Sequence, residues 1–454
     1  MVYRNRALVK YIWFCLELDD YDCSWCAPTG RLTDELVEEA FAVGDTDHCP
    51  ITTAFQNMFS ILSTWDPNGD LTLDISIYSH SDAKHWFKYL TFLPDIPSDV
   101  RLDHGTEQMI SNKVYNDPQH GWIDVLPYSA PHSRAILKVF WAIMDEGPFE
   151  SEELERQWWD QLPSVPAVTG LLLRQQNCRR WKPDSLGHMF ARFPRLQEIR
   201  YEPWREWDSI KRETDARYEY LFKSIQRFNI HLKRFVIFEN FNQQYPAFKQ
   251  RFMDGVEMTG CDSIRNPTPA VSRIVVLSTL KLEHIAASFI VDASQVFEIE
   301  LSWEWPNLVS LALTSKLLTP DEDSIEIGAM LQAAAAAAMK MPQLETMEIW
   351  NGRKGLAALF KYQASRDTLQ ATITWRGTWD FTMEPSIIQA WKAVMHKQYN
   401  GWRLNFIQEG LNEAVIKSHG DAIRYLKLSS QVVRPISLQQ ILREQKALEG
   451  VQTV

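Results

Sequence analysis

Short apolar strings recur along the chain, and most of them follow a segment of helix-forming residues. In AAAAAAMKMPQLETMEIWNG, six alanines end a helix-forming segment at 325–340. Pro342 cannot continue a helix, and Leu344, Met347 and Ile349 follow it. The last of these apolar positions alternate with polar ones, as in a strand with one buried face. The stretch therefore predicts a helix, a turn and a short strand in succession.

The same junction recurs at FPRLQEIRY and WPNLVSLALTS, and looser copies without the proline occur at AVTGLLLRQ, HLKRFVIFE, KLEHIAAS and DAIRYLKLSS. The first apolar positions of the seven strings are Val168, Leu196, Leu232, Leu282, Leu308, Leu344 and Ile423. We expect a further strand at 371–379, ATITWRGTW, and helices between the strands at 183–191, 209–228 and 385–396.

Repeated units of one strand and one helix can hide their apolar faces only by stacking on each other. They predict an α/β fold, an irregular leucine-rich-repeat-like solenoid with parallel strands on the concave side and helices outside. The units are longer than true leucine-rich repeats and lack their asparagine. An ordinary α/β domain with a buried parallel sheet would give similar strings and stays open as an alternative. We expect residues 1–454 to form a single solenoid, less regular over 1–160 and more regular over 161–454.

The N-terminal part shows the same alternation of elements with longer interruptions. VKYIWFCLEL predicts a strand, residues 54–65 predict a helix, and LTLDISIYS predicts an alternating strand. Residues 91–132, rich in Pro, Asp and Gly, predict a long loop, and residues 145–163 an acidic excursion.

Composition narrows the classes of partner and compartment. The net charge is −11, and no block of Lys or Arg is long enough to neutralise several phosphates in a row, so we expect no nucleic-acid partner. No apolar run reaches the roughly 18 residues of a membrane span, so we expect no membrane partner. Six cysteines are too sparse for a disulfide framework, which favours a reducing compartment, the cytoplasm or the nucleus.

Metal and catalytic motifs are few. Cys23 and Cys26 form a C-x-x-C, and His48 with Cys49 could complete a four-ligand zinc site if the loop folds back. Reduced cysteines that simply pack are the alternative, and we expect no cofactor. The chain has no G-x-S-x-G and no H-E-x-x-H, and Ser418, His419 and Asp421 are too close in sequence to form a triad. We therefore assign no catalytic residue and expect a protein without enzymatic activity.

Strand positions between the apolar ones would face the concave surface, where solenoids bind their partners. These positions hold Arg174, Glu198, Arg200, Glu202, Arg234, Phe238, Ser310, Thr314, Thr346, Glu348, Trp350, Tyr425 and Lys427. Mixed charges with aromatic rings suit recognition of another protein. The alternative is that adjoining loops cover Phe238 and Trp350. In the string NGRKGLAALF, Gly352 and Gly355 predict a turn that leads from a strand into a helix.

Several strings resemble a known family: RRWKPDSLGHMFARFPRLQEIRYEPWREW, FENFNQQYPAF, SFIVDASQVF, AAAAAAMKMPQLETMEIWNGR and TWRGTWDF. They are similar to an uncharacterised family of filamentous-fungal proteins that often begin with an F-box and continue into a leucine-rich-repeat-like region. The resemblance implies a substrate receptor, in which the F-box docks on the adaptor of a cullin-type ubiquitin ligase and the repeats hold the target.

The F-box signature L-P-x-E-[IL] is not found in this chain, and LPSVP is no substitute. The resemblance therefore implies either that an F-box lies upstream of these residues or that this member retains only the repeat platform. An adaptor partner is expected only in the first case. The rival hypothesis is an enzyme whose site lies at the carboxyl ends of parallel strands.

Overall fold

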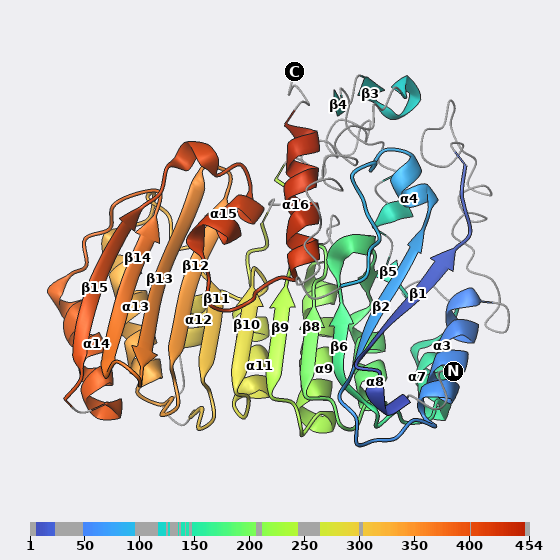
Figure 1. Cartoon of the computed structure of the whole chain (residues 1–454), viewed down its shortest axis with the longest axis horizontal. Coiled ribbons are helices and arrows are strands. Elements are labelled where there is room, and N and C mark those ends of the chain that lie inside the picture. The colour runs from blue at the N-terminus through green and yellow to red at the C-terminus, as the bar shows by residue number, and fades with distance from the viewer. Residues whose placement is uncertain are drawn as a thin grey trace.

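A single mostly parallel β-sheet organises the computed structural model. The structure describes residues 6–22, 49–95, 117–123, 126–127, 135, 138–140, 142–144, 148–205, 211–243, 264–298, 303–399 and 401–449. The sheet has eleven strands in the order β1-β2-β6-β8-β9-β10-β11-β12-β13-β14-β15 and is open rather than closed (Figure 1). Neighbouring strands are parallel except at β13, which is antiparallel to both of its neighbours.

The strands of this sheet are β1 (Tyr11–Leu18), β2 (Leu71–Ser79), β6 (Val168–Leu173), β8 (Glu198–Tyr201), β9 (Arg234–Phe238), β10 (His284–Ser288), β11 (Ser310–Thr314), β12 (Thr346–Arg353), β13 (Leu356–Ser365), β14 (Gln370–Gly377) and β15 (Arg403–Gly410). Two small sheets pair β3 (Trp122–Ile123) with β4 (Leu126–Pro127) and β5 (Ala142–Ile143) with β7 (Arg180–Trp181). Short 3-10 helices lie at Arg6–Leu8, Pro118–His120, Gln175–Asn177 and Glu413–Val415.

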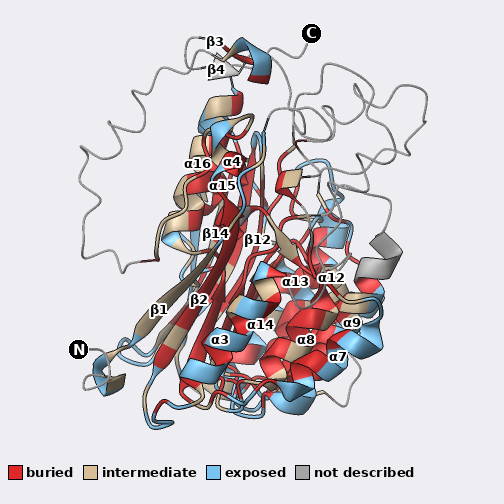
Figure 2. Cartoon of the chain, turned by 90° about the vertical axis from the view of Figure 1, so that its right-hand side faces the viewer, coloured by how far each residue is buried: buried red, intermediate tan, exposed pale blue. Residues whose placement is uncertain are grey.

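Most helices pack on one side of the sheet, which we name the helix face (Figure 2). They are α3 (Pro50–Leu62), α7 (Glu152–Gln161), α8 (Pro183–Ala191), α9 (Lys211–Phe228), α11 (Pro269–Thr279), α12 (Ala293–Phe297), α13 (Ser324–Ala338) and α14 (Pro385–Gln398). Apolar strand residues in one cross-strand row pack against them. That row contains Leu73, Leu171, Ile199, Phe235, Ile285, Leu311, Met347, Tyr362 and Ile373.

The expected α/β class with a large, mostly parallel sheet is confirmed. Six of the seven leucine-spaced strings form neighbouring parallel strands in chain order, β6 through β12. The helix predicted at 183–191 has these bounds as α8, and those predicted at 209–228 and 385–396 agree with α9 and α14 to within two residues. The strand predicted at 371–379 is β14.

The alanine-rich helix α13 packs against α14. Ala334, Ala335, Ala337 and Ala338 are buried, and the indole of Trp391 on α14 donates a hydrogen bond of 3.2 Å to a backbone carbonyl of α13. A larger side chain at the buried alanine positions would push α13 away from its neighbours, because a packed core has no spare volume.

Two of the expectations about local structure are wrong. The string at 421–430 was expected to be a strand, but His419–Leu426 is helix α15. Ser418 and Asp421 form a capping box at its start, which satisfies the free backbone N–H groups of the first turn. Gly355 does not precede a helix either: with φ of +76° it turns the chain directly from β12 into β13.

The chain returns to the other side of the sheet after β15. Residues 411–449, which include α15 (His419–Leu426) and α16 (Pro435–Leu448), lie over this second face, and we name them the C-terminal roof (Figures 1 and 2). Helix α15 packs on β12 and β13, so closely that a Cβ atom on Gly352 would lie 2.4 Å from the Cβ of Ala422. Among the described residues, no helix combines the length and hydropathy needed to span a bilayer.

Candidate protein-interaction surface

Side chains on the second face form cross-strand rows, because successive parallel strands are paired in register. The row nearest the amino ends of the strands contains Glu198, Arg234, His284, Ser310, Thr346 and Gln363, and we name it the lower polar row. Two residues further along, the middle row contains Asp74, Arg200, Ala286, Ala312, Glu348 and Lys361. The upper row, at the carboxyl ends, includes Phe238, Ser288, Thr314, Trp350 and Leu359.

The C-terminal roof buries the upper row. Phe238 and Trp350 are fully buried, and Phe289 packs edge-on against both rings. They belong to a second hydrophobic core whose other side is formed by roof residues such as Ile416 and Leu426. The expectation that these two aromatic residues face solvent is wrong, and the alternative of coverage is correct, with helix α15 and the segments beside it providing the cover.

Two buried carboxylates of the sheet bind the backbone of the roof. Glu348 accepts hydrogen bonds of 2.6 and 2.9 Å from the amides of Ser429 and Ser430. Glu202 accepts a bond of 2.7 Å from the amide of Arg434 and another from the hydroxyl of Ser437. Burial raises the pKa of Glu202. Both carboxylates were expected to face a partner, but the chain's own C-terminal segment occupies them.

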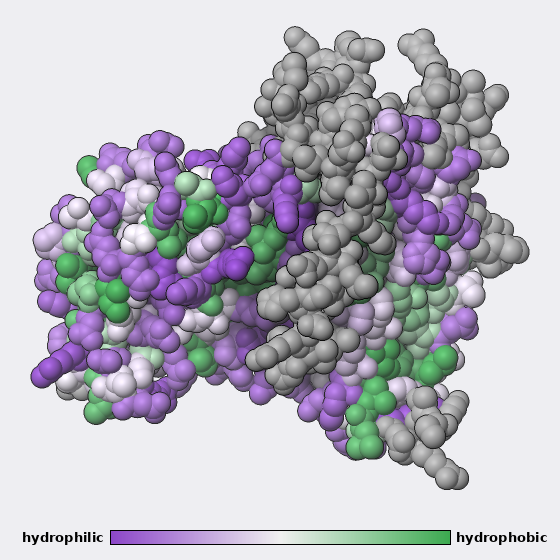
Figure 3. Space-filling model, turned by 45° about the horizontal axis from the view of Figure 1, so that its top comes forward, coloured by the Kyte–Doolittle hydropathy of each residue, from purple (hydrophilic) through white to green (hydrophobic). Residues whose placement is uncertain are grey.

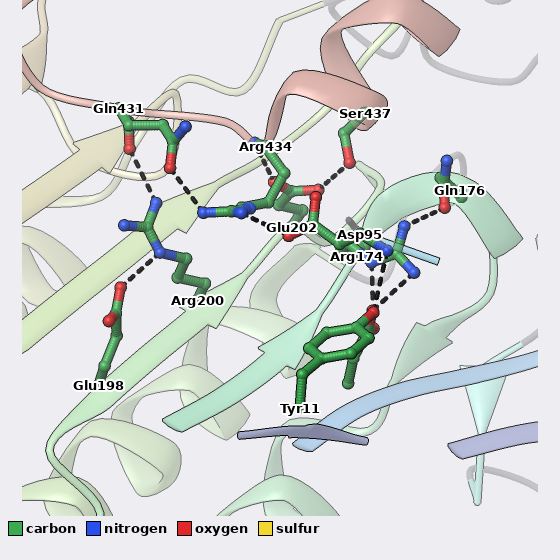
Figure 4. A network of polar contacts seen from close by, with 11 residues as sticks. Tyr11, Asp95, Arg174, Gln176, Glu198, Arg200, Glu202, Gln431, Arg434 and Ser437 are labelled. Carbon is green, nitrogen blue, oxygen red and sulfur yellow. Dashed lines mark hydrogen bonds and ion pairs between the residues drawn. The ribbon is translucent and has the colours of Figure 1, made fainter. Parts of the chain in front are cut away.

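Arg174 lies at the centre of the polar network drawn in Figure 4, and it too is buried. Its guanidinium forms a two-point ion pair with Asp74, with contacts of 3.0 and 2.7 Å. Asp74 accepts a further short hydrogen bond from the hydroxyl of Tyr11. That hydroxyl in turn accepts a hydrogen bond of 2.9 Å from the backbone amide of Asp95. Burial and the neighbouring Asp74 raise the pKa of Tyr11.

The network continues into the roof, because Asp95 pairs with Arg434 at 2.5 Å. Arg200, which lies on the neighbouring strand β8, donates a hydrogen bond of 3.2 Å to the backbone carbonyl of Gln431 and one of 2.5 Å to the carboxylate of Glu198. Arg200 and Glu202 therefore bind the roof directly, and Arg174 is linked to it through Asp74, Tyr11 and Asp95 (Figure 4).

A second buried polar chain lies at the carboxyl ends of β6 and β9. The imidazole Nε2 of His419 lies 2.8 Å from Oδ1 of Asn240. The side-chain amide nitrogen of Asn240 donates a hydrogen bond to the side-chain oxygen of Gln175. The side chain of Gln175 in turn donates a hydrogen bond of 2.8 Å to the backbone carbonyl of Ser437. The ring of His419 stacks on Phe241 with centroids 4.3 Å apart, and burial lowers the pKa of His419 to about 3. The imidazole is therefore neutral near pH 7.

The carboxyl ends of parallel strands are where open α/β sheets usually bind ligands. Here the roof fills that position. The cavity beside His419 has a volume of about 20 Å³ and is lined by residues that include Lys354, Lys417 and Glu444. This volume is enough for one water molecule.

The lower polar row lies beyond the roof and stays partly open. Glu198 and Arg234 keep 36% and 37% of their side chains exposed, and their charged groups are 3.8 Å apart. His284 Nδ1 lies 2.8 Å from the hydroxyl of Ser310. Burial and the nearby Arg234 lower the pKa of His284, so this ring is neutral near pH 7. Thr346 is half-buried and Gln363 is exposed.

The sequence predicted Glu198, Arg234, Ser310 and Thr346 in this row but missed His284 and Gln363. Alternation contained the signal for His284, since it directly precedes the buried Ile285 on β10. Tyr425 and Lys427, predicted on a strand of the same face, instead lie at the end of α15, and both are exposed.

The candidate zinc ligands are not tested as a set. Cys23, Cys26 and His48 lie outside the described residues. Cys49 is buried, forms no disulfide bond and directly precedes α3. Within the described ranges, no three His, Cys, Asp or Glu side chains are grouped so that they could hold a metal ion.

Comparison with known proteins gives one family. Residues 227–434 match the model of DUF6546, a family of unknown function. The matched range begins at the end of α9 and includes β9 to β15 together with α15, so it covers the lower polar row from Arg234 to Gln363. A comparison with curated proteins finds no match.

Proposed function

We propose that this protein is a non-enzymatic protein-interaction scaffold that binds a partner protein over the lower polar row. The observation that carries the proposal is the row itself: six polar side chains from successive strands lie in register and remain partly open beside the roof. Donors, acceptors and both charge signs within one row suit recognition of a polar protein surface.

The arrangement of the strands supports the finer reading of the fold as a leucine-rich-repeat-like array. From β6 to β12, each strand of the main sheet lies beside the main-sheet strand before it in the chain, and the described helices between them lie on the helix face. Stacked units of this kind present one continuous strand surface to a partner. We place the protein in the cytoplasm or nucleus, the compartments favoured by its sparse cysteines.

The resemblance to fungal F-box proteins supports a related role, that of a region that holds the target of a ubiquitin ligase. Binding to a cullin-ligase adaptor would require an F-box, whose signature is not found in residues 1–454. The target would then be the partner on the lower polar row.

The polar groups at the carboxyl ends of the strands favour a scaffold over an enzyme, because contacts within the chain already occupy them. Glu202, Asn240 and Gln175 bind one another or the roof, and they are buried. The side chains that stay open lie at the opposite, amino ends of the strands, and recognition of a protein needs such an accessible, extended surface.

The test compares double variants of polar residues on opposite faces. Affinity purification from fungal extract is performed with the wild type, with Arg234→Ala/Thr346→Ala, and with the control Lys223→Ala/Glu219→Ala. Glu198 is kept because it also pairs with Arg200, which anchors the roof. The control removes an exposed pair of 3.5 Å on α9, on the helix face.

We expect that a partner is recovered with the wild type and with the control, and that it is lost with the first double variant. With purified partner, the loss of affinity should be at least about fivefold, the size that marks an energetically important contact. Equal recovery by all three proteins would refute the assignment of this surface.

A further inference from the structure

The last strand of the sheet, β15, has a free edge. Within the described part of the chain it pairs only with β14, so one full edge of eight residues presents backbone N–H and C=O groups without a neighbouring strand (Figure 1). Soluble proteins usually protect such an edge with proline, with charged side chains such as lysine, or with a bulge. The sequence RLNFIQEG contains no proline or lysine, its two charges lie near its ends, and its pairing with β14 has no register shift.

Two large apolar residues lie in the middle of this edge strand. Phe406 is 41% exposed and Ile407 is 44% exposed, and they point to opposite faces of the sheet. The surrounding surface at this end of the molecule is mainly hydrophilic with scattered hydrophobic residues (Figure 3). The strand therefore favours a contact made through the main chain rather than through a broad apolar patch.

The charges at the two ends of β15 are complementary to each other. In an antiparallel pairing of β15 with itself, centred on Phe406, Arg403 of each copy lies opposite Glu409 of the other. Among described residues Arg403 makes no ion pair. Glu409 binds Arg376 at 2.7 and 2.8 Å through Oε2 alone, so Oε1 remains available, and the side chain is 43% exposed.

We propose that two copies of this chain associate through β15, antiparallel and centred on Phe406, so that the two sheets continue into each other. A two-fold contact of this kind uses the same patch on both copies and closes on itself. It places the two Phe406 rings side by side on the helix face and adds two Arg403 to Glu409 ion pairs. Cross-strand aromatic and opposite-charge pairs of this geometry stabilise antiparallel strands.

The opposite edge of the sheet fits β15 less well. Strand β1 has the sequence YIWFCLEL, whose only charge, Glu17, already binds His80 at 3.0 Å. It offers no cation to Glu409. A contact between β15 and β1 of another copy would also leave a free edge at each end and grow into open chains.

Cysteine cross-linking tests the register directly. In the proposed pairing, position 406 faces itself across the two-fold axis, within the reach of a disulfide, whereas position 408 faces Leu404. Phe406→Cys should therefore form a covalent dimer under mild oxidation, and Gln408→Cys should not. The wild type, treated identically, controls for its own six cysteines.

A charge reversal tests the affinity. The wild type should sediment as a dimer that dissociates on dilution, and Arg403→Glu should weaken this dimer at least about tenfold, because two ion pairs become two like-charge contacts. Lys281→Glu, the same charge change in an exposed loop before β10, should leave the dimer unchanged.

Several outcomes would overturn the proposal: a wild type that is monomeric at all concentrations, open chains that lengthen with concentration, or cross-linking at position 408 in place of 406. Because the readout is self-association, the result is independent of the partner-binding test above. Circular dichroism of each variant confirms that it is folded before it is compared.

Discussion

Acidification should loosen the C-terminal roof through one residue, His419. The imidazole is fully buried among Phe238, Phe241 and Phe289, and burial lowers its pKa from 6.5 to about 3. Below pH 6.5 the unfolded chain therefore binds a proton that the folded chain does not. The free energy of unfolding falls by about 1.4 kcal/mol per pH unit in the window between these two values. At about pH 5, this amounts to about 2 kcal/mol.

The assay is urea unfolding of the wild type and of His419→Gln at about pH 7 and about pH 5. A glutamine amide can still donate to Asn240 but does not titrate in this range. Other groups that titrate contribute equally to both proteins, so the difference between their pH dependences isolates His419. We expect the wild type to lose about 2 kcal/mol more than the variant on acidification. Equal losses in the two proteins would refute the assignment of a buried, neutral imidazole.

The remaining predictions concern close packing. Ala334→Leu should lower the free energy of unfolding by about 1–3 kcal/mol because it adds bulk to a fully buried position in the core, whereas Ala336→Leu, at an exposed position of the same helix, should change it by less than about 0.5 kcal/mol. Equal midpoints of thermal unfolding for these two variants would contradict the packing. Gly352→Ala should destabilise the chain because its new Cβ lies 2.4 Å from that of Ala422. Adding Ala422→Gly should recover part of the lost stability, and no recovery would show that the clash is relieved elsewhere.

Local patterns predicted the sheet well because the strands follow one another in the chain. At Leu344 to Ile349, for example, the proline before the strand and the alternation within it suffice to fix a helix end and a buried face. The same reasoning failed at Ile423 and Leu426, whose spacing of three also fits one face of a helix. The capping-box pattern at Ser418 to Asp421 was the local signal for that helix.

The state of the candidate site could not be read from local pattern at all. Alternation placed Phe238, Glu348 and Trp350 on the correct face, but exposure depends on what covers that face. The cover comes from far away in the sequence: the bond between Arg200 and Gln431 joins residues separated by 231 positions. No short window of sequence contains such a contact, which is why the lower polar row and the buried rows were not distinguished.

The roof has a consequence for biosynthesis, because it is made after the sheet. A ribosome releases the N-terminal part of a chain first, and domains fold as their residues emerge. Every strand of the main sheet precedes residue 411, so the sheet can assemble while Phe238, Trp350 and the anchoring Glu348 still lack their cover. A nascent chain at that stage would present an apolar surface bordered by charges of both signs, suited to a molecular chaperone, and a premature stop codon before residue 411 would make that exposure permanent.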